Sequence, residues 1–282
     1  GRLPSWVLWP HRTPARGLGQ HLSVVWFAAV ALLAAYLLRA RAWPLKAAVG
    51  SALDRPAPGV PAAVADFTVA TYNIHRGRGL DRRTDLVRIG AVLAGCDVAG
   101  LQEVQGPEFW SPGNQAERLA QLLELGVHFA PTRRRAFFPH RGNALLTRFP
   151  VSHWRRQPLF PNTGKIYRNL AVYRMHIGGR TVYVLNSHLS RPERQRAPLA
   201  AVIDAFSRYY PAILLGDFNA VADHPAVLEL LPPDTVDALA LGGVDSQRVD
   251  WILVRGLKVK AAWSASAGPS DHPFFAARLT FD

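Results

Sequence analysis

The sequence of 282 residues contains a single cysteine, Cys96. One cysteine excludes an intrachain disulfide and a zinc site built from several thiolates. No serine or cysteine has neighbours that would activate it as a nucleophile, and the chain has no internal repeat or low-complexity tract. The sequence therefore disfavours covalent catalysis and a thiolate metal centre, and it does not describe a repeat protein.

Acidic residues are also scarce, because 20 Asp and Glu stand against 33 Lys and Arg, which gives a net charge of +13. The excess is +6 in residues 1–65 (seven basic, one acidic) and +7 in residues 66–282 (26 basic, 19 acidic). A moderately basic domain suits a partner that carries phosphate. The same excess follows equally from a composition rich in Arg, Ala, Gly and Pro, so charge alone does not identify the partner.

Charge is absent from the apolar run over residues 22–38, which Arg39 and Arg41 follow. A helix rises about 1.5 Å per residue, so this run is at the short limit for crossing a bilayer core of roughly 30 Å. We therefore expect one transmembrane helix and a single-pass membrane protein, with the side of the remaining chain undecided. A signal peptide and a buried helix are the alternatives, disfavoured by the lack of a clear cleavage site and by the apolar character of all helix faces.

The composition divides the chain into four segments. We expect a basic N-terminal segment over 1–21, the transmembrane helix over 22–38, an Ala- and Pro-rich linker over 39–65 and one domain over 66–282. The linker has closely spaced prolines, which favour a semi-extended chain. Since 49% of all residues are hydrophobic, the domain can bury a core.

Within the domain, short β-like runs alternate with helical patterns. Apolar residues recur at helical spacing in 85–94, 115–125 and 194–209, whereas Gly178-Gly179 between two apolar runs predicts a hairpin. This mixture predicts an α/β (α+β) domain in which two sheets pack face to face with helices outside.

Six short polar motifs lie beside strand-like runs, at residues 71–74, 101–104, 186–189, 216–219, 249–252 and 270–272. They supply carboxylates, amides and two histidines. Hydrolysis of a phosphodiester needs a cation on the phosphoryl oxygens, an activated water and help for the departing oxygen. Hard oxygen ligands suit Mg2+ or Mn2+. The motifs together predict metal-assisted cleavage of a phosphate ester.

Three of these residues follow short apolar runs directly. Glu103 comes after a strand-like run, where sites commonly present their functional groups, and it is the best candidate metal ligand. Asp217 and Asn219 are two residues apart, so an extended chain points both to the same face. An acid there can orient or deprotonate a water, and an amide can stabilise developing charge.

The histidines have specific roles in this scheme. Asp250 and His272 are a candidate carboxylate–imidazole pair, in which the aspartate fixes the ring tautomer and raises its basicity. His188 is a second candidate to contact a phosphate oxygen or the leaving group.

The ordered set resembles the endonuclease/exonuclease/phosphatase superfamily, which includes deoxyribonucleases, abasic-site endonucleases, inositol polyphosphate 5-phosphatases and neutral sphingomyelinases. The residues that carry the resemblance are Asn73, Glu103, His188, Asp217, Asn219, Asp250, Asp271 and His272. The matching region is about residues 66–282. The resemblance implies a four-layer α/β/β/α sandwich and a Mg2+-dependent mechanism.

The resemblance also implies how the site is divided among these residues. Asn73 and Glu103 would hold the metal and the phosphate, with Asp271 beside the metal. Asn143 matches a family segment and would line the site, and Arg168 is a weaker candidate for gripping phosphate.

The remaining matched residues would perform the reaction. Asp217 would position or activate the attacking water, and Asn219 would stabilise the transition state. His272 would act with Asp250 behind it. The motif leaves open how proton transfer divides between Asp217 and His272.

One departure narrows the function. His75 stands where abasic-site endonucleases commonly carry an acid, so a dedicated repair enzyme of that kind is disfavoured. We expect a membrane-anchored, divalent-metal-dependent phosphodiesterase that acts on nucleic acid or on a phospholipid headgroup, with the membrane as its other partner. The alternative is a non-catalytic membrane-associated binding module on the same fold, which would be expected to lack one or more site residues.

Overall fold

The computed structural model describes residues 16–40, 42–57, 64–108, 111–135 and 138–281. The chain divides into two units, residues 1–41 and residues 42–282. The first unit contains helix α1 (Arg16–Ala40). Residues 1–15 of the predicted basic segment lie outside the described residues.

Helix α1 overlaps the transmembrane helix that the sequence predicts over 22–38. Among the described residues, no helix combines the length and the apolar character needed to cross a membrane. The predicted transmembrane helix and the single-pass membrane localisation are therefore wrong, and the membrane partner inferred from them loses its basis.

In the described part of the second unit, the strands form two seven-stranded sheets, each with parallel and antiparallel pairs. The first sheet has the order β1 (Ala42–Pro44), β5 (Gly126–Arg135), β6 (Phe138–Thr147), β4 (Val98–Gln105), β3 (Asp66–Asn73), β14 (Phe274–Thr280) and β13 (Lys258–Ala265). The second has the order β11 (Val236–Asp237), β12 (Asp250–Arg255), β10 (Ala212–Asp217), β9 (Arg180–His188), β8 (Ile166–Ile177), β7 (Val151–Thr163) and β2 (Ala48–Gly50).

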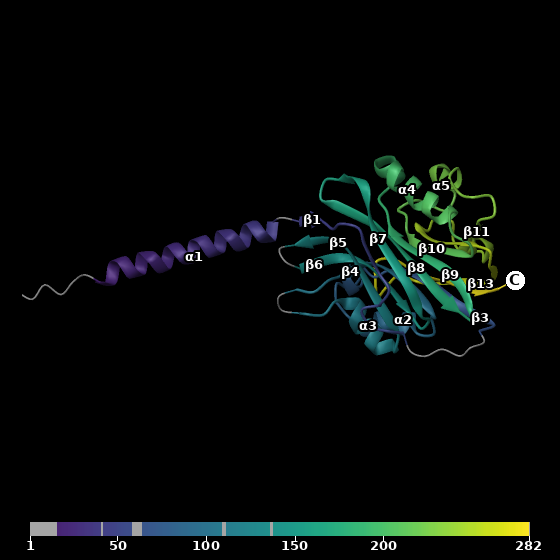
Figure 1. The fold of residues 1–282 in the computed structure, drawn as a ribbon, viewed down its shortest axis with the longest axis horizontal. Coiled ribbons are helices and arrows are strands. Elements are labelled where there is room, and N and C mark those ends of the chain that lie inside the picture. Colours follow the sequence, from purple (N-terminus) through teal and green to yellow (C-terminus); the bar gives the residue numbers. More distant parts are fainter. Residues whose placement is uncertain (1–15, 41, 58–63, 109–110, 136–137, 282) are drawn as a thin grey trace, which may run out of the picture. The chain divides into compact units, whose positions relative to one another are not determined.

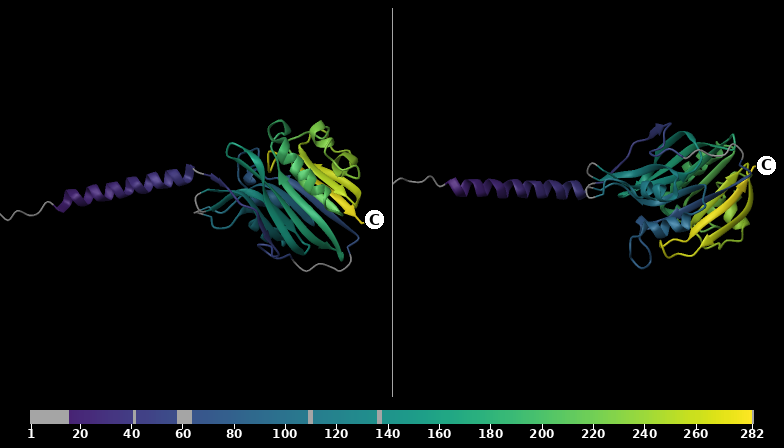
Figure 2. Two further views of the ribbon diagram at one scale, coloured as in Figure 1. Left: turned by 45° about the horizontal axis from the view of Figure 1, so that its top comes forward. Right: turned by 90° about the horizontal axis from the view of Figure 1, so that it is seen from below.

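The two sheets face each other across one apolar core, which contains Phe67, Phe149 and Tyr173. Helices α2 (Leu86–Leu93) and α3 (Gln115–Leu123) cover the outer face of the first sheet, and α4 (Pro192–Ser207) and α5 (Pro225–Leu228) cover that of the second. Figure 1 shows these helix pairs on opposite sides of the strands, and Figure 2 shows the same arrangement from two further directions. Two single-turn elements, η1 (His75–Gly77) and α6 (Ala238–Leu241), complete the described unit.

The helix boundaries follow from local chemistry. Asp85 accepts hydrogen bonds from the first backbone N–H groups of α2, and Asn114 forms a reciprocal capping box with Glu117 at the start of α3. Helix α4 begins at Pro192, whose missing N–H costs nothing at that position, rather than at the expected residue 194. Pro198 lies inside α4 in its second turn.

The stretch predicted as a linker, 39–65, contributes two short edge strands where it is described. Strand β1 pairs with β5 of the first sheet, and β2 pairs with β7 of the second. Asp54 accepts a hydrogen bond from the backbone N–H of Phe129 at 2.6 Å. Residues 42–57 therefore connect the edges of both sheets, since each short strand satisfies backbone groups that an open edge would expose.

Parallel pairing at the centre of each sheet brings polar strand ends together. In the first sheet, β3 is parallel to β4, and in the second, β9 is parallel to β10. Parallel strands end at the same edge, so the motifs that follow them meet there. The antiparallel strand β12 begins beside the end of β10, with Asp250 opposite Asp217.

Gly216 lies in β10 against the backbone of the neighbouring strand β9. A Cβ atom at this position would stand 2.1 Å from the backbone oxygen of Ser187, whereas a Cβ at Gly90 in α2 would find its nearest neighbour at 3.8 Å. We expect Gly216→Ala to lower the free energy of unfolding by about 1–3 kcal/mol or more, since the two strands must separate. Gly90→Ala should raise it by about 0.5–1 kcal/mol through helix propensity.

Urea unfolding of the two variants measures this difference. Both glycines are buried, so Gly90→Ala controls for adding a methyl group inside the fold. Equal stability of the Gly216→Ala protein and the wild type would contradict the close approach of these strands.

Candidate active site

Asp217 lies at the centre of the polar strand ends. Its side chain is 1% exposed, and its oxygens accept hydrogen bonds from the Asn73 side-chain amide and from the Asn219 backbone N–H, both at 2.9 Å. Burial raises the pKa of Asp217 to about 7, with a further contribution from the nearby Asp250 carboxylate. The carboxyl group can therefore gain and lose a proton near neutral pH.

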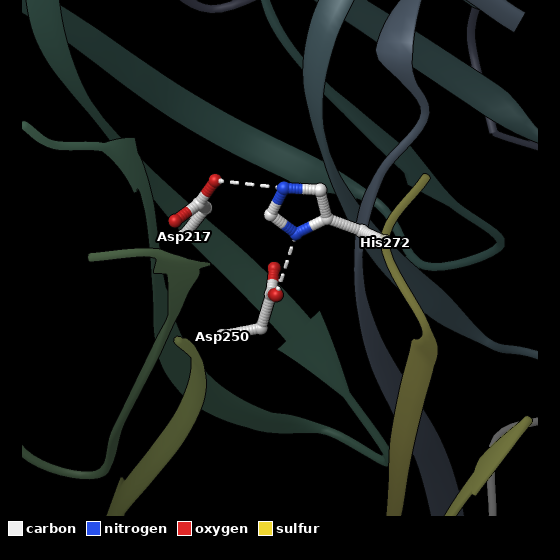
Figure 3. Close-up of side chains that lie close together, drawn as sticks. All are labelled: Asp217, Asp250 and His272. Atoms are coloured by element: carbon white, nitrogen blue, oxygen red, sulfur yellow. Dashed lines mark hydrogen bonds and ion pairs between the residues drawn. The ribbon is translucent and has the colours of Figure 1, made fainter. Parts of the chain in front are cut away.

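His272 lies between two carboxylates, as Figure 3 shows. Its Nδ1 is 2.9 Å from an Asp250 oxygen, and its Nε2 is 3.7 Å from an Asp217 oxygen. Burial disfavours the charged ring, but the hydrogen bond with Asp250 and the surrounding carboxylates outweigh burial and raise the pKa of His272 to about 9. The imidazole is therefore protonated at neutral pH.

His188 has the opposite character. It ends β9 beside Asp217, and its Nε2 is 3.4 Å from an Asp217 oxygen and 3.4 Å from the Asn219 side-chain nitrogen. Burial, together with the positive charges of Arg168 and His272, holds the pKa of His188 well below its usual range. His188 is therefore a neutral hydrogen-bonding group.

Two site residues have left-handed backbone conformations, which are uncommon outside glycine. Asn219 has a φ of 51° and donates from its side-chain nitrogen to the backbone oxygen of Leu189 at 2.9 Å. Glu103 has a φ of 56° and lies where the pairing of β4 with β6 is interrupted. Such strained positions concentrate at functional sites, because only surrounding contacts can maintain them.

Asn73 links the two sheets. Its side-chain nitrogen donates to Asp217 and lies 3.4 Å from His272 Nε2, while its side-chain oxygen accepts from the His75 backbone N–H at 3.1 Å. The Ser270 hydroxyl donates to the Asn73 backbone oxygen at 2.6 Å. Asn73 is thereby fixed on three sides, with its amide nitrogen turned toward the acid.

Glu103 lines a cavity of about 220 Å³ next to this cluster. The side chain is 25% exposed, and an oxygen lies 3.7 Å from the Arg141 guanidinium. Asn143 and Arg168, both predicted to bind substrate, line the same cavity, as does His188. The structure thus brings the predicted metal ligand and the predicted substrate-binding residues to one hollow.

Within this hollow, Asn143 is fixed and Arg168 is desolvated. Asn143 donates from its side-chain nitrogen to the Asn169 side-chain oxygen at 2.9 Å. Arg168 donates to the Ser190 hydroxyl at 3.3 Å, and burial lowers the pKa of its guanidinium to about 10. The Arg168 charge persists at neutral pH and acts in a medium of low polarity, where it attracts anions strongly.

Asp271 extends to the exposed side of the cluster. Its side chain is 44% exposed, and one oxygen lies 3.3 Å from His75 Nδ1. His75 thus contacts an acid from the far end of the chain.

Sequence reasoning missed several residues that build the site. Arg141 contacts Glu103, while Gln102 donates to the Asn186 side-chain oxygen at 2.9 Å and ties the two sheets together beneath the site. Gln102 lies inside the motif at 101–104 and Arg141 lies two residues before Asn143, and that proximity was the available signal. Their partners come from other strands, and the sequence alone does not give that register.

Two sets of residues could hold a divalent cation. Ligand atoms of Asp217, Asp250 and His272 all lie within 4.8 Å of one another. In this set, however, His272 Nδ1 is already bonded to Asp250. The predicted set of Glu103, Asn73 and Asp271 offers two partly exposed carboxylates and one buried amide oxygen, and oxygen donors are those that Mg2+ and Mn2+ prefer.

A model described as the endonuclease/exonuclease/phosphatase family matches residues 70–272. The chain belongs to this family. The resemblance inferred from the six motifs is thereby confirmed. An uncharacterized protein of Escherichia coli (strain K12), YbhP, is 29% identical over 181 residues, covering 56% of this chain and 70% of that protein.

Solved structures of the family share the fold. The protein of Beutenbergia cavernae has a TM-score of 0.64 at 24% identity, covering 77% of this chain and 72% of that one. The protein of Leptotrichia buccalis has a TM-score of 0.62 at 18% identity, covering 76% and 100%. Truncated TDP2 of Caenorhabditis elegans has a TM-score of 0.58 at 22% identity, covering 76% and 97%.

The raised pKa of Asp217 has a consequence for stability. The group stabilises the fold fully below its unfolded pKa near 3.8, and this contribution is lost as the pH rises through about 7. Asp217→Asn removes the ionisation. We expect the free energy of unfolding of the variant, relative to wild type, to increase by on the order of a few kcal/mol between about pH 4 and pH 8. Denaturant unfolding at both pH values measures this change, and an identical difference at both would contradict the buried titration.

Proposed function

We propose that the protein is a divalent-metal-dependent phosphodiesterase that hydrolyses its substrate by attack of water. The observation that carries this proposal is the buried Asp217 carboxyl, which lies beside the His272 imidazole that Asp250 supports. A base with a pKa of about 7 next to a cationic hydrogen-bond donor suits water-mediated cleavage of an anionic ester. Membership of a family of phosphoesterases and nucleases supports the same reaction class.

Glu103 and Asp271, with Asn73, would hold the ion. Their carboxylates are 25% and 44% exposed, so an ion bound there can keep water ligands, as Mg2+ commonly does. When bound, the ion supplies positive charge to a phosphoryl oxygen and to the departing oxygen.

The protein's own groups would carry the proton and charge transfers. Asp217 takes a proton from water while the water oxygen bonds to phosphorus. The bond from phosphorus to the leaving oxygen breaks, and that oxygen keeps the electron pair and takes a proton from solvent. The products are a phosphomonoester and an alcohol. The His272 imidazolium and the Asn219 side-chain amide donate hydrogen bonds to phosphoryl oxygens. Neutral His188, which lies beside Asn219, hydrogen-bonds to the same phosphoryl group without transferring a proton to it.

Removal of the base or of the imidazolium tests the proposal. We expect Asp217→Asn and His272→Ala each to lower the kcat for bis-p-nitrophenyl phosphate by about 10²–10⁴-fold, since each removes a group acting in the transition state. EDTA should abolish turnover, and Mg2+ or Mn2+ should restore it.

Asp204→Asn is the matched control, because Asp204 is an exposed carboxylate of α4 that pairs with Arg208. It should retain wild-type turnover. A folded wild-type protein that hydrolyses nothing with either metal would instead favour the non-catalytic binding module.

The two perturbed groups define the pH dependence. kcat/KM should rise as Asp217 loses its proton near pH 7 and fall as His272 loses its proton near pH 9. Asp250→Asn removes the carboxylate that raises the His272 pKa, so the falling limb should move to lower pH. Initial rates across the pH range measure both limbs, and a falling limb that stays in place in the Asp250→Asn protein would exclude His272 as its source.

A further inference from the structure

Two cavities meet at Arg168. The first, of about 220 Å³, is lined by Arg133, Arg141 and Arg168. The second, of about 350 Å³, is lined by Arg168, Arg191 and Arg194. Five arginines thus lie along one track, with Arg168 in the middle.

Two residues that lie beside Asp217, His188 and Asn219, line these cavities, whereas His272 lines a third cavity with Asp250 and Asp271. His188 lines the first cavity and Asn219 lines the second. The side-chain nitrogens of His188 and Asn219 that face each other are 3.4 Å apart. A phosphate held at the junction of the two cavities therefore has arginines on both of its sides.

The arginines of the track outnumber the acids that could neutralise them. Arg141 has Glu103 as its partner at 3.7 Å. Within the described ranges of the chain, Arg133, Arg191 and Arg194 form no ion pair with a carboxylate. Neighbouring arginines lower the pKa of Arg133 and Arg141 further, beyond the effect of burial. Like charges held this close favour the binding of several anions.

We propose that the site takes an internal phosphodiester of a single polynucleotide strand, with neighbouring phosphates held in the two arginine-lined cavities. This inference rests on the proposed phosphodiesterase activity. A strand places charges at regular intervals on both sides of the cleaved bond, and a basic groove that follows the backbone is the usual way of binding it. Because arginines lie on both sides of the junction, the cleaved bond would lie within the strand and not at the end of the strand.

The lining also distinguishes a strand from a phospholipid. Among the described residues that line the two cavities, Ile166 is the one aliphatic side chain, and Arg, Asn, Ser and Thr supply most of the rest. Acyl chains need a broad apolar surface, which this lining lacks. Ile166 is 44% exposed and reaches both cavities, and Tyr167 lies beside it in the first, so both can contact a base.

The test compares substrates of increasing length on the intact chain with Mg2+. Hydrolysis of bis-p-nitrophenyl phosphate reports the catalytic step without contacts to the outer arginines. Hydrolysis of single-stranded oligonucleotides from a dinucleotide to about 12 nucleotides reports how much those contacts add. We expect kcat/KM to rise at least tenfold with length. End-labelled oligonucleotides should give internal fragments and not single nucleotides released from one end.

Replacing one arginine in each cavity tests whether both cavities bind phosphates of the strand. Arg133→Ala and Arg194→Ala should each lower kcat/KM for the long strand at least tenfold relative to that for bis-p-nitrophenyl phosphate. Each variant should also reduce the dependence of log KM on log salt by about 0.7, the value for one lost phosphate contact.

Two exposed arginines serve as matched controls. Arg196 lies two residues after Arg194 on α4 and pairs with Glu229 at 3.2 Å, and Arg174 lies on β8 six residues after Arg168. Arg196→Ala and Arg174→Ala should behave as wild type on every length.

The outcomes separate this inference from the activity on which it rests. Hydrolysis of bis-p-nitrophenyl phosphate with no gain from length, or equal losses in track and control variants, would overturn the polynucleotide track and leave the phosphodiesterase. Faster turnover of phospholipid vesicles than of any oligonucleotide would likewise overturn it. Absence of all hydrolysis would refute the proposed phosphodiesterase activity itself.

Discussion

A carboxyl group buried between two sheets is the constraint on which this site depends. Asp217 is held in place by donors from both sheets, Asn73 from the first and the Asn219 backbone from the second. Burial without such donors would cost several kcal/mol. The position of the acid therefore requires the two sheets to be aligned in one way, with Asn73 of β3 facing Asp217 of β10.

A second polar contact beneath the site maintains the same register. Gln102 and Asn186 hydrogen-bond across the inter-sheet space, and Asn186 also donates to the backbone oxygens of Leu101 and Ala144. A buried network of this kind is satisfied in one arrangement only, so it specifies how the sheets are aligned. The apolar core would tolerate small shifts, whereas these amides would not.

The sequence predicted those parts of the site that depend on local order along the chain. Asp217 and Asn219 follow an apolar strand, and the pairing of Asp250 with His272 was expected from residue type. Arg141 and Gln102 were missed because their partners come from other strands. The transmembrane prediction was wrong since the run over 22–38 was judged on composition and length alone.

The electrostatic balance of the site explains why its acid and its cations coexist. Burial and Asp250 raise the pKa of Asp217, while His272 and Arg168 attract its negative form. A substrate phosphate between them interacts favourably with the same cations and unfavourably with the carboxylate. Proton transfer from water to Asp217 then moves one negative charge from the carboxylate onto the reacting phosphoryl group, which lies next to the same cations. The arrangement is thus unfavourable to the resting fold at high pH and favourable to the charge changes of hydrolysis.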